Sequence, residues 1–132
     1  MSEPLILVAD DDDDILLLVT TRLRRDGFNV VSASDGDQAL ALAREHKPTL
    51  AVLDIGMPGL DGLEVLAEIR ADEGLRGTLV LLLTAKAQES DVRRGYESGA
   101  DAYVKKPFSP AELSTRVRAL LDQAAESYEG AL

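Results

Sequence analysis

The sequence contains no cysteine, and this absence excludes several kinds of site. Neither a disulfide nor a thiolate-ligated metal can form, so a reducing cytoplasm is the expected location. The chain also lacks an apolar run long enough to span a bilayer, and Met1–Pro4 lacks the basic start of a signal peptide. We therefore expect a soluble, cytoplasmic protein with no membrane partner.

Basic residues are too few for a surface that binds nucleic acid. The chain has 24 acidic residues against 14 lysines and arginines, which gives a net charge of -10. Because phosphate contacts need a basic face, this domain is not expected to bind nucleic acid directly. Any effect on DNA would have to come from another domain. With 132 residues, 45% of them hydrophobic, the chain has material for one domain.

Five short apolar runs lack the alternation of half-exposed strands, which is typical of strands buried on both faces of a parallel sheet. The runs are Leu5–Ala9, Asn29–Ala33, Leu50–Leu53, Thr78–Leu83 and, more weakly, Ala102–Val104. Each is followed by a segment with helical spacing: Asp14–Asp26, Gln38–His46, Leu63–Arg70, Ser90–Ser98 and Pro110–Gln123. Five such βα units predict an α/β fold, a doubly wound parallel sheet between two helical layers, with its site at the carboxyl ends of the strands.

Apolar stripes on the first and last predicted helices indicate the faces that pack on the sheet. The stripes are Ile15, Leu18, Val19 and Leu23, and Leu113, Val117, Leu120 and Leu121. Gly27 predicts a left-handed end to the first helix, and the capping box Ser109–Glu112 starts the last helix at Ser109 or Pro110. Residues 1–124 are expected to form the domain, and residues 125–132 a tail or an extension of the last helix.

Polar residues follow the carboxyl ends of the predicted strands: Asp10 and Asp11 after the first, Asp54 at the third, Thr84 at the fourth and Lys106 past the fifth. In the strand order 2-1-3-4-5 the first and third strands flank the switch point, so three carboxylates meet in one crevice. They repel each other unless a cation lies among them, and oxygen ligands without His or Cys favour Mg²⁺ over Ca²⁺. An aspartate beside Mg²⁺, with a lysine and a hydroxyl nearby, can accept a phosphoryl group.

The acidic run Asp10–Asp14 also suggests a calcium-binding loop, but its continuation argues against one. An EF-hand loop needs glycine where Ile15 stands, and a later glutamate where this chain has hydrophobic residues. Asp12–Asp14 are instead expected to cap the first helix near its positive end.

Four motifs, in this order and spacing, resemble the receiver domain of bacterial two-component response regulators. They are ILVADDDDDI, VLDIGMPGLDG, LLTAKA and GADAYVKKPFSPAEL, and the resemblance covers roughly residues 5–121. It implies a flavodoxin-like (βα)5 fold. It also implies a phosphorylatable switch domain rather than an enzyme with an external substrate, with a sensor histidine kinase or a histidine phosphotransfer protein as phosphodonor.

The same resemblance implies a role for each matching residue. Asp54 would be the phosphoryl acceptor, and Mg²⁺, for which Mn²⁺ can substitute, would be held by Asp10, Asp11, Asp54 and the backbone carbonyl of Gly56. The phosphoryl group would be bound by Thr84, the Ala85 backbone N–H and Lys106, and Tyr103 would turn inward and alter the face made by the fourth helix, fifth strand and fifth helix. The Lys106–Pro107 bond is expected to be cis.

Two sets of residues keep open alternatives. The expected output face carries mixed charges, either solvated or pairing across a two-fold homodimer like that of winged-helix transcription-factor receivers: Arg93, Arg94, Glu97, Asp101, Arg116 and Arg118. Gly56 and Lys86 line the mouth of the site, either as tolerated surface choices or as influences on phosphoryl lifetime.

Two rival functions stand beside the switch domain. A phosphatase resembling the haloacid-dehalogenase family would also use an aspartyl phosphate and Mg²⁺, but it needs a second Asp two residues after the nucleophile, where Gly56 stands. A phosphorylation-independent interaction domain is disfavoured because every chemical position is filled. The cognate kinase, the stimulus, the output pathway and any longer parent protein are not encoded in these residues.

Overall fold

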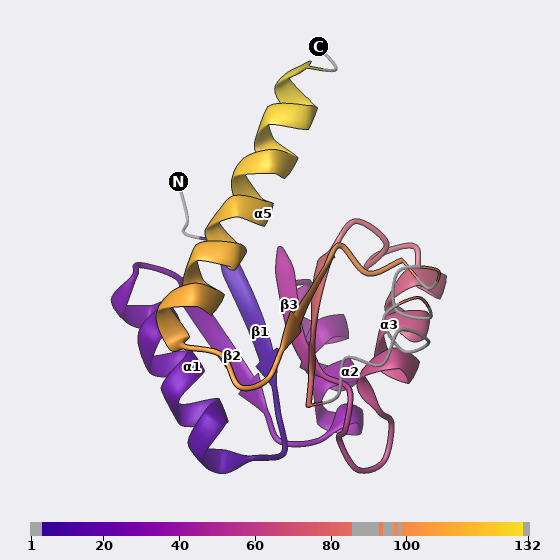
Figure 1. Cartoon of the computed structure of the whole chain (residues 1–132). Coiled ribbons are helices and arrows are strands. Elements are labelled where there is room, and N and C mark those ends of the chain that lie inside the picture. Colours follow the sequence, from indigo (N-terminus) through magenta and orange to yellow (C-terminus); the bar gives the residue numbers. More distant parts are fainter. Residues whose placement is uncertain (1–3, 86–92, 94–96, 98, 131–132) are drawn as a thin grey trace.

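Five parallel strands form one sheet in the order β2-β1-β3-β4-β5 (Figure 1). The computed structural model describes residues 4–85, 93, 97 and 99–130. The strands are β1 (Leu5–Ala9), β2 (Asn29–Ala33), β3 (Leu50–Asp54), β4 (Leu79–Thr84) and β5 (Ala102–Lys105). The predicted α/β class and strand order are confirmed. β3, β4 and β5 end one or more residues later than their apolar runs, because the backbone ladder continues through Asp54, Thr84 and Lys105 whatever their side chains.

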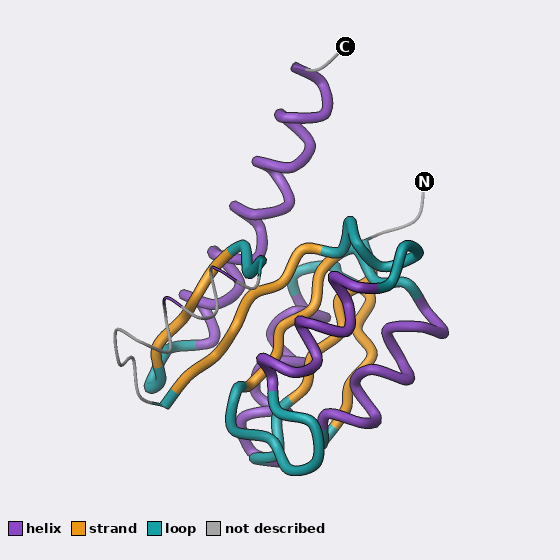
Figure 2. Tube along the Cα trace, turned by 90° about the vertical axis from the view of Figure 1, so that its right-hand side faces the viewer, coloured by secondary structure: helices purple, strands orange, loops and turns teal. Residues whose placement is uncertain are grey.

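The described helices are α1 (Asp13–Arg25), α2 (Gly36–His46), α3 (Gly62–Ala71) and α5 (Pro110–Gly130). The helix predicted over Ser90–Ser98 lies outside the described residues except at 93 and 97. α5 continues to Gly130, so the chain beyond residue 124 extends the last helix that far, and Figure 2 shows this helix rising away from the sheet. Within the described part of the chain, no helix is both long enough and apolar enough to cross a membrane.

The sheet is the middle of three layers, with α1 and α5 on one face and α2 and α3 on the other (Figure 1). Alternate residues of each strand enter the two cores: Leu7 of β1 and Leu53 of β3 pack toward α2 and α3, while Ile6 and Val52 pack toward α1 and α5. All four are fully buried. Burial on both faces explains why the strands appear in the sequence as unbroken apolar runs, and each such side chain contributes about 2 kcal/mol to stability.

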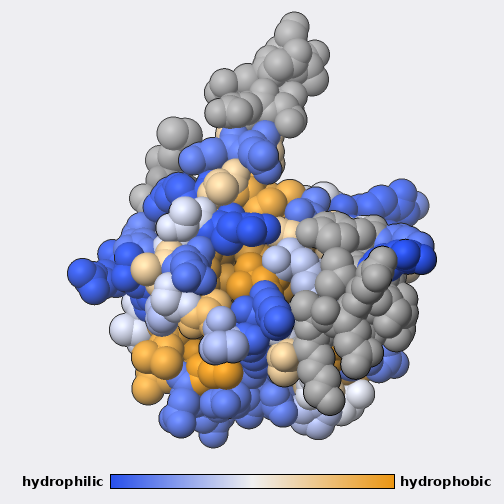
Figure 3. Space-filling view, viewed as in Figure 1, coloured by the Kyte–Doolittle hydropathy of each residue, from blue (hydrophilic) through white to orange (hydrophobic). Residues whose placement is uncertain are grey.

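The predicted core stripe of α1 is wrong at Leu18, which is 57% exposed, next to Leu17 at 65%. α1 packs on the sheet through Val19 and Leu23, both buried. Leu18 precedes Val19 by one residue, a turn of about 100° around the helix, which carries it to the edge of the stripe. Figure 3 shows apolar surface at the lower left, over the part of the molecule where α1 lies in Figure 1.

Local backbone signals fix where the helices begin and end. Gly27 has φ +98, the left-handed end predicted for α1. Asp12 caps the start of α1 by accepting from the backbone N–H groups of Asp14 and Ile15, as predicted. Ser109 Oγ accepts from the Glu112 N–H at 3.0 Å, and α5 starts at Pro110. These caps set the carboxyl ends of the strands close to the starts of the helices that follow.

The connection from β3 to α3 is closed by direct backbone contact. The Gly62 N–H donates to the Ile55 carbonyl at 3.1 Å, and a Cβ at residue 62 would lie 2.6 Å from the Asp54 carbonyl oxygen. Asp61 and Glu64 complete a reciprocal capping box at the start of α3. The end of β3 and the start of α3 are therefore held against each other.

Candidate functional site

Asp54 is the last residue of β3, and only 5% of its surface is exposed. Its Oδ1 accepts a hydrogen bond from the Gly56 N–H at 3.3 Å and lies 3.4 Å from Nζ of Lys106. The side chain opens into a pocket of about 620 Å³ that Gly56 also lines. A Cβ at residue 56 would find no atom nearer than Asp54 Oδ2, at 4.0 Å. The glycine leaves this side of the carboxylate uncovered.

Asp10 and Asp11 follow β1 and lie beside Asp54, as the strand order predicted. Asp10 is fully buried; its Oδ1 accepts from the Asp12 N–H at 2.9 Å, and its Oδ2 lies 3.0 Å from Lys106 Nζ. The Oδ2 contact is an ion pair without the geometry of a hydrogen bond, so this buried oxygen keeps unused acceptor capacity. Asp11 is exposed and lines the same pocket as Asp54.

The three aspartates fit a divalent cation. One carboxylate oxygen from each of Asp10, Asp11 and Asp54 lies within 4.8 Å of the others. The donors are all oxygens, which suits a hard ion, and the under-used Oδ2 of Asp10 faces this cluster's cationic neighbour, Lys106. These three aspartates therefore fit the Mg²⁺ ion that the sequence predicts.

Lys106 follows β5 and reaches into the carboxylate cluster. Its backbone N–H donates to the Thr84 carbonyl at 2.7 Å, and the Lys106–Pro107 peptide bond is cis, as expected. Burial by itself lowers the pKa of the Lys106 ammonium, but the neighbouring carboxylates of Asp10 and Asp54 outweigh burial and raise it overall. Lys106 is therefore a permanent cation at neutral pH, shared between two carboxylates.

Burial and the crowding of carboxylates together shift the pKa of Asp54. Burial, followed by the charge of Asp10, raises the pKa of Asp54 from 3.8 to about 6, against the opposing effects of Lys106 and the Gly56 N–H. One lysine does not balance the negative charge of the cluster. A cation or an electrophile that draws charge from the Asp54 carboxylate is favoured at this position.

The other residues assigned from the resemblance lie around the same pocket or beside it. Thr84 is buried at the end of β4 and lines the pocket together with Ala85. Tyr103 on β5 packs against the core between the sheet and α2–α3, with its hydroxyl buried. Lys86 lies outside the described residues. The roles of these residues stay predictions.

The residues predicted for a dimer face do not form one uniform surface. Asp101 Oδ2 pairs with Arg70 Nη2 at 3.0 Å within the chain. Arg118 lies over the Phe28 ring, 4.4 Å from its centroid, and donates to the Asp26 carbonyl at 3.2 Å. Both side chains thus have partners in their own chain.

The remaining members of that set lie elsewhere. Arg116 is exposed and lines a groove with Tyr103 and Glu112 on β5 and α5. Arg93 and Glu97 are also exposed, while Arg94 lies outside the described residues.

The carboxyl side chain of Asp26 joins α1 to α5. Its Oδ2 accepts from Arg22 Nε at 2.9 Å and from the Ser114 hydroxyl. The Ser114 bond, followed by the Arg22 bond, holds the pKa of Asp26 below its usual value. Together with the Arg118 contacts, this network fastens the end of α1 to the middle of α5.

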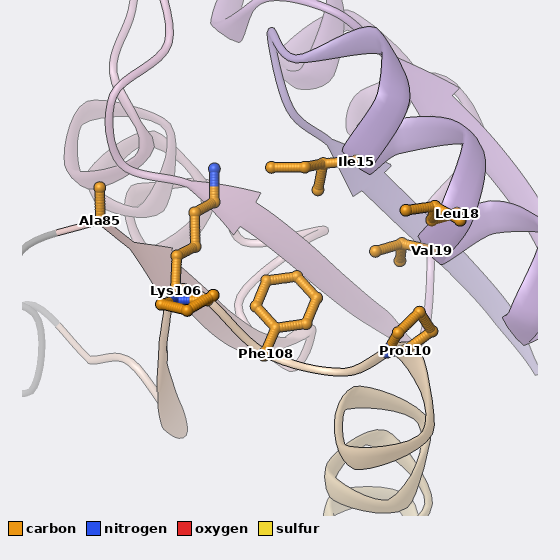
Figure 4. Close-up of a pocket in the computed structure, with 8 residues that line it drawn as sticks. Ile15, Leu18, Val19, Ala85, Lys106, Phe108 and Pro110 are labelled. Carbon is orange, nitrogen blue, oxygen red and sulfur yellow. The ribbon is translucent and has the colours of Figure 1, made fainter.

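Sequence reasoning missed an apolar pocket of about 390 Å³ beside the acceptor pocket. Figure 4 shows Ile15, Leu18 and Val19 of α1 facing Phe108 and Pro110 across it. Ala85 and Lys106 line both pockets, so the two lie side by side. The apolar residue Leu18 was visible in the sequence, but it was predicted to pack in the core with the rest of its stripe, whereas it is exposed and lines this pocket.

Arg70 was missed as well. It lies near the end of α3 and bonds to residues that lie up to 31 positions away along the chain. No local pattern in the sequence marks it, because its partners are backbone carbonyls of other segments and the side chain of the distant Asp101.

The fold and its acidic edge together define a receiver domain of the CheY-like type. The chain matches the response regulator receiver domain family over residues 6–118 and belongs to that family. It is 46% identical over 125 residues to the DNA-binding response regulator MtrA of Mycolicibacterium smegmatis, covering 92% of this chain and 54% of MtrA. It is 47% identical over 116 residues to the regulatory protein PhoP of Bacillus subtilis, covering 88% of this chain and 48% of PhoP. The chain thus spans about half the length of these relatives.

Solved structures agree with this assignment. A CheY-like receiver domain from Methanospirillum hungatei superposes with a TM-score of 0.89 at 28% identity, covering 96% of this chain and 99% of that one. A receiver domain from Francisella superposes with a TM-score of 0.85 at 35% identity, covering 92% of this chain and 99% of that one. The beryllofluoride-activated DrrB receiver domain superposes with a TM-score of 0.81 at 34% identity, covering 91% of this chain and 98% of that one.

The raised pKa of Asp54 predicts a pH-dependent gain in stability for Asp54→Asn when a chelator keeps metal away. The folded protein holds a proton on Asp54 up to about pH 6, whereas the unfolded chain releases it near 3.8. Stabilisation by the neutral form is therefore complete below the lower value and is lost as pH rises through the higher one. The variant should be more stable than the wild type by about 1–3 kcal/mol at about pH 7.5, the upper bound being the pKa difference and the lower allowing for screening by water.

Urea denaturation of both proteins at about pH 7.5 and about pH 4 measures this difference. The difference should shrink to well under about 1 kcal/mol at the lower pH, where Asp54 is neutral in the folded protein and only partly ionised in the unfolded chain. Glu73→Gln, in the exposed turn after α3, is the control and should be neutral at both values. A variant no more stable than the wild type near neutral pH would contradict the electrostatic description of the cluster.

Proposed function

We propose that Asp54 accepts a phosphoryl group from a histidine kinase or a histidine phosphotransfer protein, and that the modified domain controls a partner or an output domain. The observation that carries this proposal is the position of Lys106 Nζ, 3.0 Å from Asp10 and 3.4 Å from Asp54, at an edge where three carboxylates converge. Family membership supports the reaction class. The domain modifies itself and turns over no external substrate.

The proposed transfer is a displacement at phosphorus. A carboxylate oxygen of Asp54 forms a bond to phosphorus while the bond from phosphorus to the donor nitrogen breaks, and that nitrogen keeps the electron pair and takes a proton from solvent. The Gly56 N–H and Lys106 orient the carboxylate through Oδ1. Lys106 then pairs with the incoming phosphoryl oxygens, and Thr84 and the Ala85 N–H lie at the same pocket to bind them.

A metal ion completes the proposed site. Asp10, Asp11, Asp54 and the carbonyl of Gly56 would hold Mg²⁺, with Mn²⁺ as a substitute. Bound there, the ion would neutralise charge on the transferring oxygens. The raised pKa of Asp54 supports this assignment, because a cation at the cluster would lower that pKa and favour the ionised form needed for attack.

The rival phosphatase function is not supported. Residue 56 is a glycine that brings no acid or base to the acceptor, and the chain matches receiver domains over residues 6–118. The relatives MtrA and PhoP are named as regulators, MtrA as DNA-binding, and this chain spans about half of each. We therefore propose a cytoplasmic regulatory role, with residues 1–124 as the receiver domain and the output on another segment or partner.

Incubation with acetyl phosphate and Mg²⁺ should add the mass of one phosphoryl group to the wild-type protein. Asp54→Asn should remove the modification, and excess EDTA should slow it strongly because the carboxylate cluster then lacks its cation. Intact-mass spectrometry measures both effects. Equal labelling of Asp54→Asn would disprove the acceptor assignment, and absence of labelling in the wild type would favour the phosphorylation-independent alternative.

The apolar pocket beside the acceptor is the proposed docking site of the protein phosphodonor. Leu17 and Leu18 are exposed, Leu18 lines the pocket, and the pocket shares Lys106 with the acceptor site. An apolar helix face placed there would bring a donor histidine to Asp54.

Leu18→Arg should therefore slow transfer from a kinase by about tenfold or more while leaving acetyl phosphate labelling unchanged. The kinase used is the fastest donor in a panel of purified histidine kinase cytoplasmic domains. Thr21→Arg, at an exposed position of the same helix that does not line the pocket, is the matched control. Equal slowing with both donors, or with neither, would disprove docking at this pocket.

We also propose a homodimer through the face made by the predicted fourth helix, β5 and α5, in which the exposed side chains of Arg93, Glu97 and Arg116 are the charges that pair across the two-fold axis. With Mg²⁺ and beryllofluoride, light scattering should show the mass rising toward twice that of the monomer, and Arg116→Glu should oppose the rise. Arg44→Glu, on the exposed surface of α2, should behave as the wild type. An unchanged mass with the phosphoryl mimic would exclude this dimer.

A further inference from the structure

Arg70, near the end of α3, uses its whole guanidinium group as a clamp. Nε and Nη2 donate to the Gly99 carbonyl at 3.0 and 2.7 Å, Nη1 donates to the carbonyls of Thr78 and Arg76 at 2.6 and 3.2 Å, and Nη2 also donates to Asp101 Oδ2 at 3.0 Å. These five bonds match the five N–H donors of an arginine. The side chain is 22% exposed. A network this complete and this sheltered fixes its partners more firmly than a surface ion pair does.

The partners of Arg70 lie just before the two neighbouring strands β4 and β5. Thr78 precedes β4, and Gly99 and Asp101 precede β5. Asp101 adds two bonds of its own, because its Oδ2 accepts from the Val80 N–H and its N–H donates to the Val80 carbonyl, both at 2.8 Å. Gly99 has φ +100, and a Cβ there would lie 2.9 Å from Arg70 Nε. The chain is therefore shaped at this turn to admit the arginine.

β5 depends on such an anchor because it is short and at the edge of the sheet. It has four residues and pairs with β4 on one side only. At its start the Arg70–Asp101 clamp fixes it, and past its end the Lys106 N–H bonds to the Thr84 carbonyl at 2.7 Å. Only the four residues of β5 separate Asp101 from Lys106, so a shift at the start of the strand moves the backbone that carries Lys106.

α3 also links this clamp to the acceptor. The helix begins at Gly62, in backbone contact with Asp54, and Arg70 lies two turns later. The acceptor at the end of β3 and the anchor of β5 are thus attached to one short rigid helix.

We propose that Arg70 is a positioning residue for phosphoryl transfer: it fixes the start of β5 from α3 and thereby places the Lys106 ammonium between Asp10 and Asp54. This inference rests on the proposed function. Arg70 is not among the residues that line the acceptor pocket, so its effect on the reaction is indirect, and in this proposal it passes through Lys106. A role in overall stability alone would instead act independently of Lys106.

A double-mutant cycle separates these two roles. The initial rate of labelling by acetyl phosphate with Mg²⁺ is measured for the wild type, Arg70→Gln, Lys106→Ala and the double variant. Arg70→Gln should slow labelling by about tenfold, in keeping with the cost of a misplaced catalytic group, and should add less than about twofold in the Lys106→Ala background. Arg44→Gln, an exposed arginine on α2 with ion pairs to Glu68 and Asp72, should leave the rate unchanged.

Conservative variants keep the experiment informative if Arg70→Gln folds poorly. Arg70→Lys keeps the charge but loses the fork that binds Gly99 and Thr78, and Asp101→Asn removes one arm of the clamp; each should lower the rate by a smaller factor with the thermal midpoint little changed. Slowing of the same size in both Lys106 backgrounds, or no slowing in any clamp variant that folds, would overturn the positioning role. Failure of the wild type itself to be labelled, with Asp54→Asn as reference, would instead count against the proposed function.

Discussion

The crowding of three carboxylates at one edge of the sheet is the constraint on which the rest of the site depends. Asp10, Asp11 and Asp54 are brought together by the parallel order of β1 and β3, whose backbones are fixed by burial on both faces. The repulsion cannot relax by moving the strands, because both cores pack against them. It is relieved instead by positive charge: Lys106 from inside the chain, and a proton or a metal cation from outside. The fold therefore holds the three aspartates in an arrangement that a bound cation would stabilise.

Much of this arrangement could be predicted because it depends on local pattern and on one topological rule. Unbroken apolar runs identified the five strands, and the carboxyl ends of parallel strands meet at one edge, so Asp10, Asp54 and Lys106 were placed correctly before any coordinates were available. Asp12 was expected to cap α1 because capping is decided within three residues. These inferences need no knowledge of how distant elements pack.

The errors and omissions arise where packing decides. Leu18 was assigned to the core because helical spacing gives the face of a residue only to within one position, and α1 turns it to the edge of its stripe. Asp101 and Arg118 appeared as free surface charges because their partners, Arg70 and Phe28, are distant in sequence. Arg70 itself bonds mostly to backbone carbonyls, which every residue carries, so no pattern of residue types in the sequence predicts its role.

The network around Asp26 has a mechanical consequence. It fixes the end of α1 to Ser114 and Arg118 in the first half of α5, while Pro110 at the start of α5 and Ile15 in the first turn of α1 border the same apolar pocket. The 21 residues of α5 correspond to a rod about 32 Å long, whose far end stands clear of the sheet. A tilt of about 5° at Pro110 would carry the tip of that rod through about 3 Å. A small rotation of α5 about its start beside Lys106 would therefore give a larger displacement at Gly130 than in the first turns of the helix.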